Sequence, residues 1–367
     1  MSPAVVTTRT TANKIKRTAR ESALILLFIA FIAAGSVGGA SEVDEPGSSF
    51  ADANGGNGYL VPIAPVWLGG DVTVNATVPQ SGKASLELDD VNLLVRYEPL
   101  PRLAFFSETR LENTLEVSVG SGARVDSSDI FIERLYADLL VSPHLTVRVG
   151  KFLTPFGVWN EIRRAPLTWT VERPLVTERT FPEHTTGGGI FYQATLHGWS
   201  IDATGYAPAQ DELPLRSSDE AGLTLVGGRV AAAHEVGAAY LSLGLNGVGA
   251  ERRGHGGLEP AAGADINLNI AGNDLLGEFV YARSPERFVD DEWGLYIQDA
   301  VPLRNDLYGI LRYEHFRSFR DGQIEVGLIG LTWRPYAHLI IKADYQLTNK
   351  PSDDVPKGLL ASLSIFF

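Results

Sequence analysis

The chain has 367 residues, of which 44% are hydrophobic and 20% are charged, and its formal net charge is −13 at pH 7. An acidic surface of this kind disfavours binding to nucleic acid, which is itself an anion. The chain has no cysteine, so disulfides, thiolate metal sites and cysteine nucleophiles are excluded.

The first 40 residues are predicted to be a secretory signal peptide. Basic residues come first, the apolar run Ala23–Ala34 follows, and small residues lead to Ala40. The apolar run is shorter than the roughly 20 residues of a spanning helix, although a membrane anchor is the alternative. The segment holds five of the 31 basic and one of the 44 acidic residues, so its removal leaves a net charge of −17.

Residues 41–66 are acidic and rich in glycine, serine, asparagine and proline, and we predict that they form a flexible N-terminus of the mature chain. Residues 67–367 alternate short strand-like segments with turn signals, and none of their apolar runs is long enough for a spanning helix. Only helices and closed barrels satisfy their backbone hydrogen bonds in lipid. If this region lies in a membrane, it must therefore be a barrel.

Sixteen strands are predicted, and the connections between them alternate between short turns and longer polar loops. This alternation and the even strand count are typical of a bacterial outer-membrane barrel. The predicted fold is therefore an all-β, transmembrane antiparallel β-barrel of about 16 strands. The predicted strands are 67–78, 84–98, 102–118, 129–142, 144–152, 188–197, 198–206, 222–233, 235–248, 261–271, 274–283, 293–302, 306–316, 323–334, 337–348 and 357–367.

Alternate side chains of several predicted strands differ in polarity, as in 102–118 and 337–348. A row of charges suits a water-filled lumen, because a charge costs several kcal/mol at the lipid midplane. Segment 323–334 fits this pattern poorly, since both of its faces are partly apolar. The predicted pore-lining residues are Glu112, Glu116, Arg134, Arg148, Arg312, Lys342 and Asp344.

The longest connection, roughly 153–187, carries several aromatic and many charged residues. A long segment without regular structure inside a compact domain usually has a function. We predict that it folds inward and narrows the pore, where mixed charge selects solutes by size and charge. A loop packed over the rim or against a neighbouring subunit is the alternative. The predicted constriction residues are Glu161, Arg163, Arg164, Glu172 and Arg173.

The stretch VGKFLTPFGVWNE (Val149–Glu161) resembles the Gly-Lys/Arg-x-x-x-Pro-Phe-Gly sequence of bacterial outer-membrane porins, including the phosphate-selective porin O/P group. The resemblance implies a 16-stranded barrel, often a homotrimer, that passes small hydrophilic solutes or ions. Phosphate-selective porins rely on lumens rich in lysine and arginine. Because the predicted lumen here is mixed in charge, phosphate specificity does not follow.

The last strand, 357–367, alternates apolar residues and ends on Phe367. This pattern resembles the assembly signal of outer-membrane proteins, and implies contact with the barrel-assembly machinery. Outer-membrane lipid is the other expected partner, and the bacterial outer membrane is the expected location.

The predicted function is a passive diffusion channel that needs no cofactor. A non-conducting barrel with a structural, adhesive or receptor role, in which the long connection plugs the lumen, is the alternative. The seven histidines show no metal-ligand spacing. A serine hydrolase on the outer rim is a third class, since a catalytic triad is recognised by its geometry and not by its sequence.

Overall fold

The computed structural model describes residues 59–61, 64–118, 122–124, 129–209, 223–252, 258–284, 291–318, 320–352 and 354–367. The predicted signal peptide and most of the predicted flexible segment 41–66 lie outside these residues. All described strands belong to one compact unit, Ser49–Phe366. No helix within the described ranges combines the length and apolarity required to cross a membrane.

One antiparallel sheet forms this unit, and two short strands, β1 (Tyr59–Leu60) and β5 (Gly122–Arg124), pair with β2 and β4. The sixteen long strands are β2 Val66–Pro79, β3 Ser85–Leu100, β4 Leu103–Ser118, β6 Asp129–Ser142, β7 Leu145–Leu153, β8 His184–Leu196, β9 Trp199–Pro208, β10 Leu223–Val236, β11 Ala239–Arg252, β12 Leu258–Ile270, β13 Asn273–Ala282, β14 Glu292–Arg304, β15 Leu307–Ser318, β16 Gly322–Tyr336, β17 Leu339–Thr348 and β18 Gly358–Phe366.

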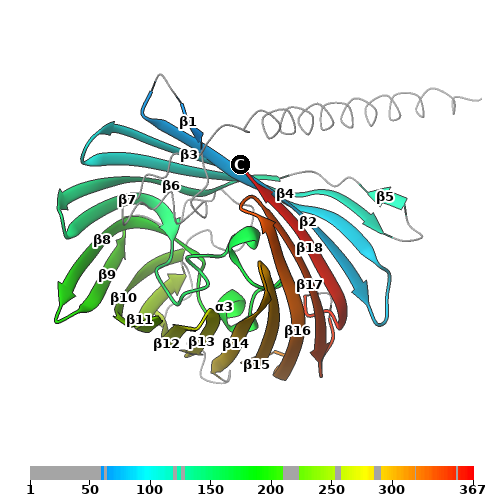
Figure 1. Cartoon of the computed structure of the whole chain (residues 1–367). Helices are drawn as coiled ribbons and strands as arrows, with labels where there is room; N and C mark the ends of the chain where they lie inside the picture. The colour runs from blue at the N-terminus through cyan, green and yellow to red at the C-terminus, as the bar shows by residue number, and fades with distance from the viewer. Residues whose placement is uncertain are drawn as a thin grey trace, which may run out of the picture. The chain divides into compact units, whose positions relative to one another are not determined.

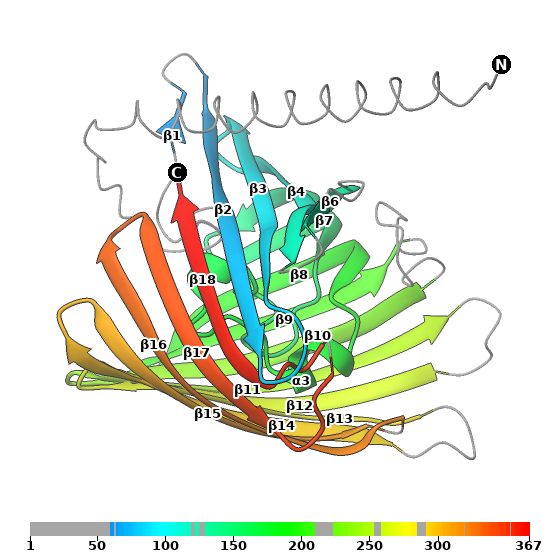
Figure 2. The same ribbon diagram turned by 90° about the vertical axis from the view of Figure 1, so that its right-hand side faces the viewer.

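The long strands pair in chain order, and the sheet closes where β18 pairs antiparallel with β2, with Ile365 opposite Val72. Figures 1 and 2 show this seam as the red strand beside the blue one. The predicted 16-stranded antiparallel barrel is therefore confirmed. The predicted strand ends differ from the observed ones by at most four residues.

Two of the short turns explain why successive strands pair as tight hairpins. His197 and Gly198 both have positive φ, at 52° and 83°, and Ala271 and Gly272 have 52° and 84°. Two successive residues of positive φ form the turn whose twist matches that of the flanking antiparallel strands. These turns fix the register of β8 with β9 and of β12 with β13.

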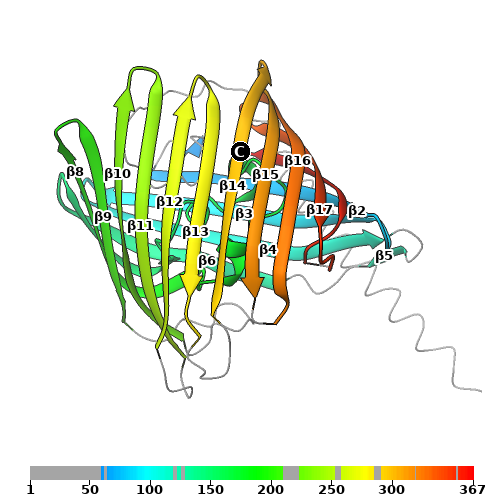
Figure 3. The same ribbon diagram turned by 90° about the horizontal axis from the view of Figure 1, so that it is seen from below.

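The outer face of the barrel is apolar. Large hydrophobic side chains on its outward rows stay exposed, among them Leu245 on β11, Leu311 on β15 and Ile329 on β16. Figure 3 shows strands β8 to β17 side by side from the outside. Soluble monomers rarely expose continuous apolar surfaces of this kind, whereas a membrane barrel presents such a band to hydrocarbon. The outer face is therefore the lipid-facing one.

Candidate functional site

Between β7 and β8 the chain leaves the sheet and folds into the barrel, as the long connection was predicted to do. Residues 154–183 contain a short 3-10 helix, η1 (Ala165–Leu167), and one α-helical turn, α3 (Leu175–Arg179). Figures 1 and 2 show this segment inside the ring of strands. Pro166 lies in the first turn of η1 and Pro174 caps α3, positions where the fixed φ of proline is favourable.

The inward faces of β13 to β18 and of β2 form a wall that the loop covers, which we name the covered wall. Three of its carboxylates accept hydrogen bonds from backbone N–H groups of the loop. Because a buried N–H without a partner is costly, these bonds fix the path of the loop backbone. The bonds join Glu278 to Trp159 at 2.9 Å, Glu314 to Leu175 at 2.8 Å and Asp344 to Val171 at 2.7 Å.

Two basic side chains of the covered wall donate hydrogen bonds to the same loop. The Nζ atom of Lys342 donates to Ala165 O at 2.5 Å, to Thr168 Oγ1 at 2.8 Å and to Thr170 O at 2.9 Å. Arg312 donates to Thr170 Oγ1 at 2.7 Å. Lys342 thus uses all three ammonium hydrogens on the loop.

Ion pairs attach the loop to the first strands of the barrel. Arg164 pairs with Asp71 on β2 and lies 3.8 Å from Glu108 on β4. Glu108 also pairs with Arg134 on β6. All four side chains are at most 10% exposed. Each buried charge in this group therefore faces a group of opposite charge, as burial requires.

A second group of charges holds the two ends of the loop together. The loop residue Glu183 lies 2.9 Å from Arg163 and 2.7 Å from Arg173. Although burial raises the pKa of Glu183, the two guanidinium groups hold it below its usual value. Arg163 also lies 3.5 Å from Glu133 of β6, which is 2.6 Å from His184.

Apolar packing covers part of the inner wall. Phe156 and Phe181 of the loop contact each other with ring centroids 4.3 Å apart, and they join Trp159 and Val176 in one buried cluster. This cluster explains the apolar inward row of segment 323–334, since loop side chains replace water on that face. The wall residues in the cluster include Leu223, Leu225, Val248, Ala250, Tyr296, Ile324 and Val326.

Polar side chains at the short-turn ends of β6 to β10 remain exposed or half-buried on inward rows, and we name them the open wall. Their exposure contrasts with the covered wall: Arg148 and Arg229 are 16% and 13% exposed, whereas Arg312 is 1% exposed. Water therefore reaches the open wall and not the covered one. The open wall consists of Asp138, Arg148, Gln193, Asp202, Arg229 and Glu235.

Arg148 has a fixed orientation on the open wall. Its guanidinium group makes two hydrogen bonds to Asp138, at 2.7 and 2.8 Å, the bidentate geometry that arginine forms with a carboxylate. The same group lies 3.8 Å from the ring centroid of Tyr136 and 4.6 Å from that of Phe191. Stacking on these aromatic faces further restricts its motion.

The five predicted constriction residues lie in different surroundings. Arg163, Arg164 and Arg173 each make an ion pair with a carboxylate. Burial raises the pKa of Glu172 to about 7, and the nearby Glu178 adds to this effect. Glu161 is exposed. Of these five residues, one is therefore exposed and four are at least partly buried.

The predicted pore-lining residues are divided among the two walls, β4 and β6. Arg148 belongs to the open wall, while Arg312, Lys342 and Asp344 lie beneath the loop, and Arg134 is buried against Glu108. Glu116 is half-buried and accepts a hydrogen bond from Ser118 at 2.7 Å. The backbone of Glu112 pairs with Asp90, and its side chain lies outside the described part of the chain.

Sequence reasoning missed several inward carboxylates that hold the loop, namely Asp71, Glu278 and Glu314. Asp71 and Glu278 occur on predicted strands next to glycine and apolar residues, whereas Glu314 lies between Tyr313 and His315. For the first two, a carboxylate among apolar neighbours was the available signal, because such a group needs a partner in either lipid or protein. The missing information was the path of the loop.

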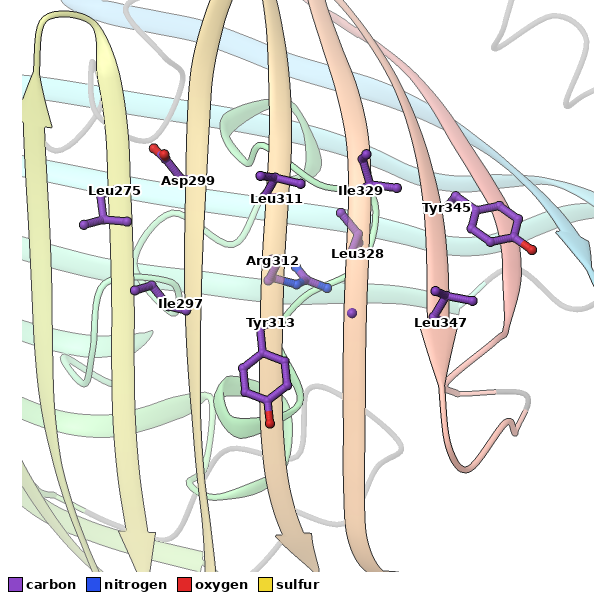
Figure 4. A pocket seen from close by; sticks show the side chains of 11 residues that line it. Leu275, Ile297, Asp299, Leu311, Arg312, Tyr313, Leu328, Ile329, Tyr345 and Leu347 are labelled. Atoms are coloured by element: carbon purple, nitrogen blue, oxygen red, sulfur yellow. The ribbon is translucent and has the colours of Figure 1, made fainter.

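A separate groove of about 460 Å³ lies between outward-facing side chains of β13 to β17, which Figure 4 shows. Leu311, Ile329 and Tyr345 line it, and Gly327 leaves open space because it has no side chain. Asp299 lies at its edge on the outward row of β14. The groove faces the lipid side and does not belong to the lumen.

Comparison with known proteins gives a weak sequence match and a clear structural one. No known protein family matches the sequence. The chain is 30% identical over 105 residues to an uncharacterized protein of Aquifex aeolicus (strain VF5). That match covers 29% of this chain, which spans only 23% of the length of the curated relative.

Three solved structures of bacterial proteins resemble this one. OprB of Pseudomonas putida has a TM-score of 0.57 at 8% identity, covering 82% of this chain and 93% of OprB. OmpF of Salmonella typhi, solved with daunomycin, has a TM-score of 0.54 at 12% identity, with 82% and 97% covered. An anion-selective porin of Comamonas acidovorans has a TM-score of 0.51 at 14% identity, with 82% and 98% covered. The protein therefore has the fold of a bacterial outer-membrane barrel.

Proposed function

We propose that the protein is an outer-membrane porin, a passive channel for small hydrophilic solutes or ions. The observation that carries this proposal is the open wall, a set of solvated polar side chains inside a closed barrel whose outer face is apolar. A polar interior and an apolar exterior are what a water column through a membrane requires. The likeness in fold to known porins supports the proposal. The channel works without a cofactor and without catalysis.

The loop sets the width of the channel in this proposal. Glu161 faces the water-filled part of the lumen, and Arg163, Arg164 and Arg173 hold the loop in place through their ion pairs. Glu172 lies between these groups and the covered wall. Solutes pass beside Arg148 of the open wall, so size is limited by the distance between the loop and β6 to β10.

Export and assembly complete the proposal. Residues 1–40 direct export and are removed, and residues 41–66 form a flexible N-terminus. The barrel-assembly machinery recognises the strand that ends at Phe367, and the mature protein is a homotrimer in outer-membrane lipid.

Recording from the purified protein in a planar lipid bilayer tests the channel. The expected result is a stepwise increase in ion conductance as single barrels insert. Circular dichroism on the same sample confirms that the barrel is folded. A folded sample that carries no current contradicts the proposal.

A second candidate is a non-conducting barrel with a structural, adhesive or receptor role, in which the loop is a plug. The contacts of the loop with both Glu133 on β6 and Glu278 on β13 favour it, since these two strands lie on nearly opposite sides of the barrel. Replacing residues 158–182 by a short glycine–serine linker separates the candidates. Loss of a plug creates conductance in a silent protein, whereas loss of a constriction enlarges the conductance that the intact protein already has.

A further inference from the structure

The basic residues of the open wall are already paired. Arg148 is held by Asp138 through two hydrogen bonds, and Arg229 is 2.6 Å from Asp265. Asp265 also accepts a hydrogen bond from Asn246 at 2.8 Å. A paired arginine and carboxylate form a neutral unit, whose field falls off faster with distance than that of a single charge.

Two carboxylates near Arg148 and Arg229 are unpaired, in addition to the exposed Glu235 at the short-turn end of β10. Glu161 of the loop and Asp202 of β9 have neither an ion pair nor a hydrogen bond to any described side chain. Glu161 is exposed and Asp202 is half-buried, so both are in contact with water. Desolvation raises the pKa of Glu161, the charges of Arg229 and Arg148 lower it, and the weaker effects of Asp265 and Asp202 raise it.

The predicted positive charges of the loop do not offset these carboxylates. Arg163 and Arg173 share Glu183, and Arg164 pairs with Asp71. The sequence alone indicated a loop of mixed charge. With these ion pairs known, the charged side chains of the loop that remain exposed are the carboxylates of Glu161 and Glu178.

We propose that the channel selects cations, and that Glu161 and Asp202 determine this selectivity; the inference rests on the proposed channel function. Fixed negative charges raise the local concentration of cations and lower that of anions. The effect reaches about 8 Å at physiological ionic strength, which is comparable to the width of a narrowed pore. The permeating class is therefore small cations. This is the opposite sign to the anion-selective porin of similar fold.

The reversal potential in a potassium chloride gradient measures the selectivity. The intact protein is expected to pass potassium more readily than chloride. Glu161→Gln and Asp202→Asn should each lower the ratio of potassium to chloride permeability about two- to threefold, the effect of one charge at several ångströms in water. The double variant should lower it further, to near unity or below. The current carried by ethylammonium chloride should change in parallel.

Two further variants test whether the permeability ratio depends on charges beside the pore or on the total charge of the protein. Asp299→Asn removes the same charge from the outer face of the barrel, and should leave the permeability ratio unchanged (Figure 4). Arg148→Gln removes a positive charge and releases Asp138 from its partner. This change should raise the preference for potassium about two- to threefold.

The outcomes distinguish this inference from the proposed function. A protein that conducts but prefers chloride overturns the inference and leaves the channel intact. The inference also fails if Glu161→Gln and Asp202→Asn both behave like Asp299→Asn in folded protein. A folded protein that carries no current overturns the channel, and the inference with it.

Discussion

The covered wall and the open wall are built from the same alternating strands, but they neutralise their charges in different ways. Lys342 and Arg312 on the covered wall bond to the loop, whereas Arg148 on the open wall bonds to Asp138 on the next strand. A buried charge requires partners, so Lys342 and Arg312 of the covered wall have all of their bonding partners only when the loop is in place. The two arginines of the open wall, Arg148 and Arg229, keep their carboxylate partners without the loop. The loop thus acts as structural support for one wall and as a boundary of the water column for the other.

Replacing Lys342 by methionine should have the largest effect on the covered wall. The change removes three hydrogen bonds to the loop and leaves their buried acceptors without this donor. An unsatisfied buried polar group costs about 1–3 kcal/mol of the free energy of unfolding, so the loss of three bonds should exceed that of a single one. Thermal unfolding in detergent, followed by circular dichroism, measures the loss. Arg148→Met is the matched variant of the open wall and should cost about 1 kcal/mol or less. Equal losses of stability in Lys342→Met and Arg148→Met would contradict the proposed difference between the covered wall and the open wall.

A methyl group at Gly157 should disturb the contact between the loop and β13. Gly157 has a φ of 67°, and a Cβ built there would lie 1.9 Å from Glu278 Oε2. Gly157→Ala should cost about 1–3 kcal/mol, because both the backbone and the buried carboxylate must shift. The control is Gly205→Ala on β9, where no atom lies within 4 Å of the added carbon. That variant should stay within about 0.5 kcal/mol of the original in the same thermal measurement.

The loop should respond to pH through Glu172. Burial raises the pKa of this group from 4.5 to about 7, so the folded protein holds the neutral carboxyl more tightly than the unfolded chain does. Its stabilising contribution is present below pH 4.5 and is lost as the pH rises through 7.

The loss across this range should amount to about 1–3 kcal/mol. Glu172→Gln, which cannot ionise, should remove this part of the difference in melting temperature between pH 5 and pH 8. An unchanged pH difference in this variant would show that Glu172 is ionised in the folded loop.

The smallest effect is expected for Arg179 at the end of α3. It lies 3.4 Å from Asp321 and 3.5 Å from Asp354, whose side chains are 53% and 79% exposed. Solvated ion pairs contribute between about 0 and 1 kcal/mol. Arg179→Ala should therefore lower the melting temperature only slightly, and 0.5 M salt should remove the difference. A loss as large as that of Lys342→Met would mean that this end of the loop is anchored as firmly as the covered wall.

The strands could be predicted from the sequence because their signal is local. A period of two, and turn residues such as His197 and Gly198, are visible within ten residues, and the closed 16-stranded barrel followed from counting them. The inward direction of the loop was predicted from its length and its aromatic residues.

The partners within the site could not be predicted in this way. Arg164 pairs with Asp71, which is 93 positions earlier in the chain, and Val171 is bonded to Asp344, which is 173 positions later. No periodic pattern reports such pairs, because they depend on the path of the loop through three dimensions. The sequence therefore shows a loop of mixed charge, but the ion pairs decide which of these charges stay solvated.

Glu278, Glu314 and Asp344 hold the loop by its backbone N–H groups and not by its side chains. Every amino acid except proline offers the same donor, so many different loop sequences could follow this path across the barrel. A pore of altered selectivity could be engineered by exchanging loop side chains such as Glu161, provided that these three acceptors remain. The strands and their acceptor carboxylates would then stay unchanged, and only the loop side chains that set the selectivity would be exchanged.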